Sequence, residues 1–256
     1  LKKDLDALHE WSLRQKLPFN LQKCKMLHVG KRVDYSPNYT LGHQDLVWTD
    51  EEKDLGVWIS NTLKTSLQCY AVYKKTSRVL ALLKRIFGTF TKETLPRIIN
   101  TYVRPAMQYA IQAWAPWMQK DIVLLQRIYH RATKLVTGLQ NKPYEERITS
   151  LNLFDFSYRR IRGDLILTYN ILRIPNHPLQ NLFVRRKPRI TRSHDFSLAV
   201  PHSRVNCRRH FFAVRVCFAW NSLPEEVVNS PNLEMLKTEL DEFLSTRPNT
   251  ETPYNQ

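Results

Sequence analysis

Residues 55–88 read LGVWISNTLKTSLQCYAVYKKTSRVLALLKRIFG, and the hydrophobic pattern changes its period within this stretch. Up to Ile59 the apolar residues form a short run typical of a β-strand. From Leu63 onward they recur at the three- and four-residue spacing of an α-helix, which should end near Gly88. The change predicts a chain that begins with strands and continues with helices.

This helix carries an apolar stripe and a set of basic residues. The stripe that should face the core consists of Leu67, Ala71, Val79, Leu82, Leu83 and Ile86. The basic residues are Lys74, Lys75, Arg78, Lys84 and Arg85. Lys74, Arg78 and Arg85 fall near one face, apart from the stripe, which suits phosphate contacts along a duplex without sequence preference. A solvated face is the alternative.

The residues before this helix predict one amphipathic helix over 1–16 and then short strands separated by turn-forming residues. We expect these strands to pair antiparallel. The acidic stretch that contains Asp50, Glu51, Glu52 and Asp54 is interpreted as a solvated hairpin turn rather than a metal site.

The residues after Gly88 are predicted to be helical apart from one loop. Thr91 can cap a helix that reaches about Ala110 and is kinked at Pro105, and Asp121 can cap the next one. The apolar face of that helix should be Val123, Leu124, Ile128, Ala132 and Leu135. Further helices are expected over 143–151, 158–172, 207–221 and 231–244, with a loop or linker over 175–201. The fold class is therefore α+β and mostly helical.

The net charge of +16 is concentrated in the middle of the chain. Residues 61–215 carry +21, residues 1–60 are neutral, and residues 216–256 carry −5. This division predicts a polyanionic partner, and RNA, DNA or an RNA–DNA duplex is the expected one. The sequence contains neither a membrane-length apolar run nor a secretory segment, so we expect a nuclear or cytoplasmic protein that is not secreted.

A second basic stretch, residues 185–215, interleaves cations with phenylalanines. Its candidate binding residues are Arg185, Arg186, Lys187, Arg189, Arg208 and Arg209. Such a stretch suits single-stranded or structured nucleic acid. Disorder and a nuclear-import signal at its start are the alternatives.

Two other features of the sequence invite functional interpretations that we do not favour. Cys207 and His210 approach the spacing of zinc ligands, but the sequence has no matching second pair, so no metal site is predicted. The aromatic residues Tyr102, Tyr109, Trp114 and Trp117 could stack on bases, although a place in the core is the preferred interpretation.

Seven short blocks occur in order along the chain. They are Phe19-Asn20 with Lys23-Cys24-Lys25, Lys53–Val57, Tyr102–Pro105, Gln126-Arg127 with Arg131–Lys134, Tyr144–Arg147, Arg159-Arg160 with Arg162–Leu165, and Trp220–Pro224. In this order and spacing they resemble the back half of a reverse transcriptase from a non-LTR (LINE-type) retrotransposon of the jockey-like group.

The resemblance implies an organisation in three parts. Residues 1–62 would be the end of a palm, 63–174 a helical thumb that follows the template–primer duplex, and 175–256 a basic linker with a helical extension. Leu55-Gly56-Val57 would match the primer-grip hairpin. From the pattern alone, an ordinary hairpin with a glycine bulge is the alternative.

The family's catalytic Tyr-x-Asp-Asp turn does not occur in this sequence. Asp4 and Asp6 cannot replace it, because residues two apart on a helix point to different faces. We therefore expect no polymerase activity, no cofactor and no small-molecule substrate for this chain, since magnesium and deoxynucleotides belong to the intact family enzyme. Because the first residue is Leu1, the sequence is expected to begin inside a longer reading frame. A non-catalytic nucleic-acid-binding module and an inert relic of a decayed element are the alternatives.

Overall fold

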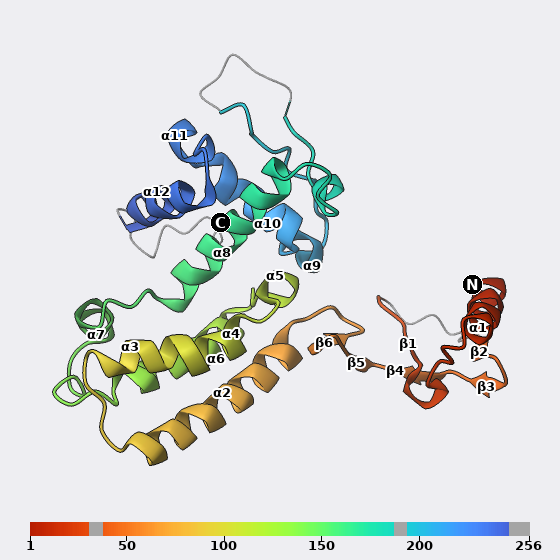
Figure 1. Ribbon diagram of the computed structural model, residues 1–256, viewed down its shortest axis with the longest axis horizontal. Coiled ribbons are helices and arrows are strands. Elements are labelled where there is room, and N and C mark those ends of the chain that lie inside the picture. Colours follow the sequence, from red (N-terminus) through yellow and green to blue (C-terminus); the bar gives the residue numbers. More distant parts are fainter. Residues whose placement is uncertain (31–37, 187–193, 246–256) are drawn as a thin grey trace. The chain divides into compact units, whose positions relative to one another are not determined.

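The computed structural model describes residues 1–30, 38–186 and 194–245. The chain forms two compact units, Leu1–Gln68 and Cys69–Gln256, and each is described by itself below (Figure 1). The predicted class is confirmed, because most elements are helices and the strands are few and short. Among the described residues, no helix combines the length and the apolarity that crossing a bilayer requires.

The first unit consists of a helix and three two-stranded sheets. Its elements are α1 (Lys2–Arg14), a 3₁₀ turn (Leu21–Lys23), β1 (Lys25–Leu27), β2 (Thr40–Leu41), β3 (Gln44–Asp45), β4 (Val47–Thr49), β5 (Glu51–Asp54) and β6 (Val57–Ser60). The β2–β3 and β5–β6 pairs are antiparallel, as expected, but β1 pairs with β4 in parallel. The β2–β3 hairpin lies between β1 and β4 in the sequence, and after this hairpin β4 runs beside β1 in the same direction.

The acidic stretch is a strand, and its interpretation as a turn was wrong. Residues 51–54 form β5, and Asp54 stands opposite Val57 in the β5–β6 register. The turn is made by Leu55 and Gly56, which have positive φ values of 44° and 86°. Two consecutive residues with positive φ are characteristic of the type I′ turn, whose twist matches that of a two-stranded hairpin, and glycine adopts this conformation without strain.

The helical part of the chain begins with α2 (Ser66–Phe87), which straddles the boundary between the two units. It continues with α3 (Thr94–Ile98), a π-helical segment (Ile99–Val103), α4 (Arg104–Gln108), α5 (Ile111–Trp114), α6 (Gln119–Thr133), α7 (Tyr144–Ser150) and α8 (Phe156–Arg173). Thr91 caps α3 as expected, because its Oγ1 accepts a hydrogen bond from the Thr94 amide at 3.2 Å. The π-helical segment lies directly before Pro105, whose missing N–H and bulky ring disturb the helix at the predicted kink.

The buried face of α2 is rotated from the predicted stripe. The side chains that it buries belong to Gln68, Cys69, Val72, Thr76, Leu80 and Leu83. Leu82 and Ile86 are 47% and 63% exposed, so their assignment to the core was wrong. Thr76 can lie inside because its hydroxyl donates to the Val72 carbonyl at 2.7 Å, which satisfies the polar group within the helix itself.

Helix α6 also differs from its predicted form at the N-terminal end. It begins at Gln119, two residues before the expected cap Asp121, whose side chain is buried instead. Val123 was assigned to the apolar face but is 37% exposed, whereas Leu125 and Tyr129 are buried. Tyr129 therefore belongs to the packed face of α6, whereas Val123, which was predicted to lie there, does not.

The C-terminal part of the second unit packs around α8. Its elements are a 3₁₀ turn (Gln180–Leu182), α9 (Asn206–Arg209), α10 (Phe212–Asn221), α11 (Glu225–Val228) and α12 (Leu233–Ser245). One helix was expected over 207–221, but α9 and α10 are separate. Side chains from α8, α10, α11 and α12 share one hydrophobic core, in which Trp220 is almost fully buried.

The stretch predicted as a loop or linker is a loop that packs onto this core. Leu198 is fully buried, and its backbone N–H and C=O both bond to the side-chain amide of Asn221 at 2.8 Å. The indole Nε1 of Trp220 donates to the Phe196 carbonyl at 3.0 Å. Buried backbone groups require partners, so Asn221 supplies in a loop what a neighbouring strand would supply in a sheet.

A buried ion pair connects α8 to α10. Arg215 is 7% exposed and donates to both carboxylate oxygens of Asp164, at 3.0 and 3.2 Å, while Asp164 is fully buried. The same guanidinium donates to the carbonyls of His210 and Gln112. A neighbouring guanidinium, that of Arg160, donates to the Pro116 carbonyl at 2.6 Å. These bonds attach α8 and α10 to the segment that leads from α5 to α6.

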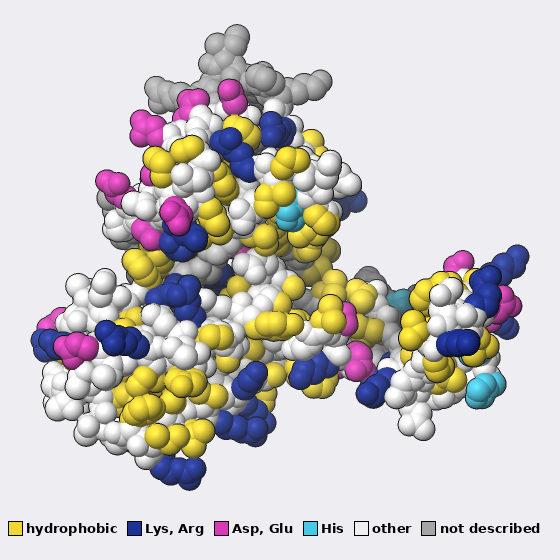
Figure 2. Space-filling model, viewed as in Figure 1, with side chains coloured by type: hydrophobic (Ala, Val, Ile, Leu, Met, Phe, Trp, Pro, Cys, Tyr) yellow, Lys and Arg dark blue, Asp and Glu magenta, His cyan; other side chains and the backbone are white. Residues whose placement is uncertain are grey.

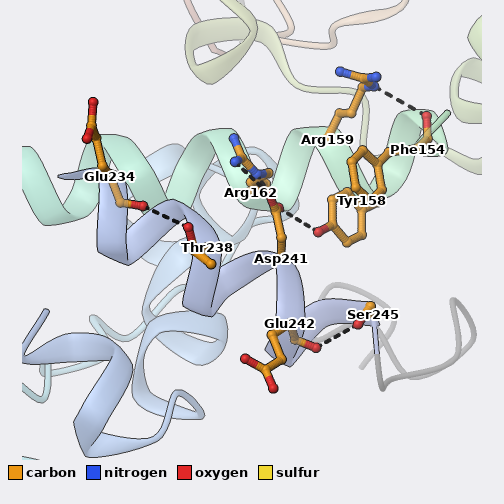
Figure 3. Close-up of polar contacts among 9 residues, drawn as sticks. All are labelled: Phe154, Tyr158, Arg159, Arg162, Glu234, Thr238, Asp241, Glu242 and Ser245. Atoms are coloured by element: carbon orange, nitrogen blue, oxygen red, sulfur yellow. Dashed lines mark hydrogen bonds and ion pairs between the residues drawn. The ribbon is translucent and has the colours of Figure 1, made fainter. Parts of the chain in front are cut away.

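A second charged contact attaches α12 to α8, and Figure 3 shows Tyr158 and Arg162 converging on Asp241. The Tyr158 hydroxyl donates to Asp241 at 2.7 Å, and the Arg162 guanidinium pairs with the same carboxylate in a two-point contact. Burial alone would raise the pKa of Asp241, but the hydrogen bonds from Arg162 and Tyr158 outweigh it and hold the pKa below its ordinary value. Asp241 is therefore ionised at neutral pH.

Replacing Asp164 with alanine should destabilise the protein by about 3 kcal/mol or more, because it leaves the buried guanidinium of Arg215 without its carboxylate. Replacing both partners with apolar residues, Asp164→Leu with Arg215→Met, should recover most of that loss. Asp195→Ala, at an exposed aspartate, should change stability by less than about 0.5 kcal/mol and serves as the control. Urea denaturation at pH 7 measures all three. Equal stability of the parent and the Asp164→Ala variant would contradict this role.

The contact at Asp241 should make α12 sensitive to acid. Because its folded pKa is depressed, the stability that it contributes is fully present above the unfolded pKa of about 4 and is lost as the pH falls through the folded value. Asp241→Asn should therefore cost about 1 kcal/mol at pH 7, a figure reduced for the partial exposure of the pair, and progressively less as the pH falls below about 4. The measurement is the difference in unfolding free energy between parent and variant at several pH values. A difference that does not change with pH would rule out ionisation as the cause.

Candidate nucleic-acid interface

The outward side of α2 is a row of cations. At 100° per residue, Lys74, Arg78 and Arg85 lie within about 40° of one another, directly opposite the buried side chains. We call these three residues the α2 basic face. All three are exposed, and so are the flanking Lys75 and Lys84. Figure 2 shows dark blue side chains along this helix.

The charges of this row are not neutralised by neighbouring carboxylates. Within the described residues, none of the five basic side chains of α2 takes part in an ion pair. The one aromatic contact is that of Lys74, whose Nζ lies 4.6 Å from the centre of the Tyr70 ring. Lys74, Arg78 and Arg85 thus share one exposed and positively charged face of α2, and Lys75 and Lys84 flank it.

Helix α6 extends this surface, and its residues were not among the predicted site residues. Arg131 reaches across to α2, where its Nη1 donates to the Ser77 hydroxyl at 3.4 Å. Together with Arg127 and Lys134 it lines a hollow of about 370 Å³, whose other lining residues are Val123, Gln126 and His130. We call this feature the α6 hollow. The signal in the sequence was the block Gln126-Arg127 with Arg131–Lys134.

The predicted basic residues of the C-terminal stretch lie on separate elements. Arg185 and Arg186 are exposed in an extended segment that pairs with the backbone of residues 197–199. Arg208 and Arg209 are exposed on α9. Lys187 and Arg189 lie outside the described residues. The structure therefore groups the candidate cations of α2 but distributes those of the C-terminal stretch.

The phenylalanines of this stretch are engaged by arginines of the protein itself. Phe196 has the guanidinium of Arg173 at 4.4 Å and that of Arg185 at 4.7 Å from its ring centre. Phe211 is contacted by Arg208 at 5.2 Å, and Phe212 is buried. A base that stacked on Phe196 would have to displace these contacts, so cations rather than rings are the accessible feature here.

The Leu55-Gly56-Val57 segment is a hairpin in the first unit. Leu55 stands at its tip and is 84% exposed, and Gly56 lies in the turn rather than within a strand. The close backbone approach expected for a glycine inside a strand therefore does not apply. What the hairpin does present is an exposed apolar side chain at a rigid two-residue turn.

The aromatic cluster divides between the core and the surface. Trp114 is 2% exposed, and its Nε1 donates to the Tyr109 carbonyl at 2.8 Å, which confirms its place in the core. Tyr102 and Tyr109 are 53% and 58% exposed, so their assignment to the core was wrong. Trp117 is half-buried and stacks on His210, with ring centres 5.1 Å apart and planes 6° apart.

His210, one of the two residues considered for zinc, is therefore engaged by Trp117. Burial lowers the pKa of its imidazole, and the positive charges of Arg209, Arg215 and Arg160 lower it further. Over the described part of the chain, no three histidine, cysteine, aspartate or glutamate side chains come together in a group that could hold a metal ion.

No protein-family model matches the chain, and neither a curated protein nor a solved structure is similar to it. The chemistry of the protein's own surface is therefore the basis for inferring its function. The α2 basic face, the α6 hollow beside it and the exposed arginines of the C-terminal part offer many hydrogen-bond donors and unneutralised positive charge. Such a surface suits a partner that carries repeated negative charges.

Proposed function

We propose that the chain is the template–primer-holding part of a non-LTR retrotransposon reverse transcriptase, without that enzyme's catalytic centre. The single observation that carries the nucleic-acid part of this proposal is the α2 basic face: Lys74, Arg78 and Arg85 are aligned over residues 74–85, eleven helical steps, opposite the buried side of the helix. At 1.5 Å per residue this row is about 17 Å long, which spans several phosphates of a duplex.

The proposed partner is an RNA–DNA duplex, RNA or DNA in the nucleus or cytoplasm. Lysine and arginine contacts with phosphates give affinity without reading bases, and a row on one rigid helix can follow a duplex backbone. Six acidic side chains of the second unit lie on α11 and α12, where Figure 2 shows magenta atoms, whereas Glu145 and Glu146 lie on α7. This separation of charge would orient a polyanion toward α2 and α6.

The assignment to a reverse transcriptase rests on the order of the sequence blocks and on two features of the first unit. The hairpin with Leu55 at its tip is the kind of element that a primer grip requires. Leu8 and Trp11, on the apolar side of α1, are 46% and 47% exposed, which suits a helix that packs against further parts of a polymerase. A nucleic-acid-binding protein without catalytic activity would use the same interface, and it would differ from the proposed reverse-transcriptase fragment only in its evolutionary origin.

The purified chain should not extend a primer on an RNA template, with either magnesium or manganese. Two-metal phosphoryl transfer needs carboxylates that hold two cations about 4 Å apart, and the family's carboxylate turn does not occur in the sequence. A primer-extension assay on the repurified chain tests this expectation, with an intact reverse transcriptase as the positive control. Incorporation that co-purifies with the chain would show that other residues supply the metal site.

Binding to an RNA–DNA duplex should weaken steeply with salt. If about six phosphates are neutralised, the slope of log K against log salt is about −5, and base sequence should matter little. The triple variant K74A/R78A/R85A should reduce the magnitude of that slope by about three, roughly one for each lost phosphate contact. Fluorescence-anisotropy titrations at four or more salt concentrations provide both slopes.

The matched control for this variant removes the same charge elsewhere. Lys2, Lys3 and Arg14 are exposed on α1, so K2A/K3A/R14A lowers the net charge equally but leaves α2 intact. It should bind with nearly the parental slope. Identical slopes for the two triple variants would mean that α2 makes no specific contact and would favour an inert relic with a solvated basic surface.

A further inference from the structure

The α6 hollow is a concave feature within an otherwise convex basic surface. Its volume of about 370 Å³ falls within the range of roughly 300–1,000 Å³ typical of small-molecule sites. All of its lining residues come from the exposed side of α6, between Val123 and Lys134. Val123 contributes apolar surface, and the aliphatic stems of the long side chains around it add more.

The charged groups of the hollow are positive. Arg127 and Lys134 make neither a hydrogen bond nor an ion pair with any described residue, and Arg131 makes only its long bond to Ser77. The residues that line the hollow include no aspartate or glutamate. A ligand that fits must therefore carry negative charge that faces Arg127, Arg131 and Lys134. It must also offer apolar surface to Val123.

His130 adds a neutral imidazole to the polar side chains that line the hollow, and a stacking contact holds it in place. His130 lies against the Tyr144 ring, with centres 3.7 Å apart and planes 11° apart. Tyr144 is itself fixed, because its hydroxyl donates to Asp155 at 2.9 Å. Burial, followed by the charge of Arg147, lowers the pKa of His130, which supports the neutral form at neutral pH. A neutral imidazole offers one donor and one acceptor, the combination that base edges also carry.

A double helix cannot fill such a hollow. The bases of a double helix are stacked in its interior, and its outer surface is the broad, rounded sugar–phosphate backbone. That backbone would contact the cations of the hollow and leave Val123 without an apolar partner. An unpaired nucleotide combines a flat, largely apolar base with an adjacent phosphate. Arg127 and Arg131 are four residues apart, so they lie about 6 Å apart along the helix, close to the separation of successive phosphates on one strand.

We propose that the α6 hollow binds an unpaired nucleotide of the strand that α2 holds. The base lies over Val123 beside His130, and the flanking phosphates contact Arg127, Arg131 and Lys134. This inference rests on the proposed function, since α2 must first hold the nucleic acid. It adds that the bound substrate has a single-stranded position next to its duplex, and unpaired bases are the usual targets of stacking and edge contacts in RNA recognition.

The test compares an RNA–DNA duplex with the same duplex that carries one unpaired nucleotide as a bulge or overhang. The parent chain should bind the substrate with the unpaired nucleotide about tenfold more tightly, because the apolar contact of the base with Val123 and the added phosphate contact both favour it. Val123→Gln replaces the apolar side chain with a longer, uncharged polar one that carries no ring, so it should remove this preference while leaving the affinity for the plain duplex unchanged. Met235→Gln, at an exposed apolar residue of α12, is the matched control and should keep the preference.

Each outcome separates this inference from the proposed function. Binding of the duplex without any preference for the unpaired nucleotide would overturn the inference and leave the proposed function intact. A preference that survives Val123→Gln would also overturn it. Displacement of the bulged substrate by polyglutamate as efficiently as by an unlabelled strand would show that the hollow recognises only charge, and would overturn the assignment to a nucleotide. Failure to bind any oligonucleotide would overturn both proposals.

Discussion

The helical unit depends on the burial of one guanidinium group. Arg215 is nearly inaccessible to water, and its donors are taken by the carboxylate of Asp164 and by the carbonyls of His210 and Gln112. A buried arginine is tolerated only when such partners surround it. Because those partners come from α8, from the C-cap of α9 and from α5, satisfying this one group fixes three segments relative to one another.

The same physical rule explains why the exterior is so basic. Cations that have a carboxylate beside them, such as Arg215 and Arg162, can be covered by other helices. A carbonyl can serve instead of a carboxylate, as it does for the buried guanidinium groups of Arg147 and Arg160. Cations that lack a buried acceptor, such as Lys74 and Arg78, remain in water, because burial would remove their hydration without compensation. Helix α2 therefore turns its cations outward by necessity, and a basic face results whether or not selection for binding placed it there. Only a binding measurement distinguishes the two.

Arginine has a second structural use in the C-terminal part, where it covers aromatic rings. Arg173 and Arg185 lie over Phe196, so the loop of residues 194–199 is held by cation–π contacts as well as by Asn221. An interleaved pattern of arginine and phenylalanine can therefore describe packing within a protein as well as a platform for bases. Arg173, Arg185 and Arg208 are thus engaged with rings of the protein, whereas the cations of the α2 basic face share one exposed side of a single helix.

The sequence by itself determined the helices whose ends are marked by local chemistry. Pro143 precedes α7, Asp155 caps α8 through the Ser157 amide, and Gly88 directly follows α2, so these boundaries were predicted to within about two residues. It also determined the distribution of charge and the helical spacing of Lys74, Arg78 and Arg85, because both follow from composition and a fixed period.

Only the tertiary structure decided which face of each helix is buried and which distant residues meet. The buried face of α2 includes Thr76, because its hydroxyl forms a hydrogen bond within the helix. A hydrophobic pattern contains no sign that such a polar side chain is satisfied. The parallel β1–β4 pairing and the pairing of Arg215 with Asp164, 51 residues away, are likewise absent from any local signal. The α6 hollow belongs to the same class, because a concavity depends on how neighbouring side chains stand in space. Periodicity fixes positions along one element, whereas contacts between elements depend on satisfying every buried polar group at once.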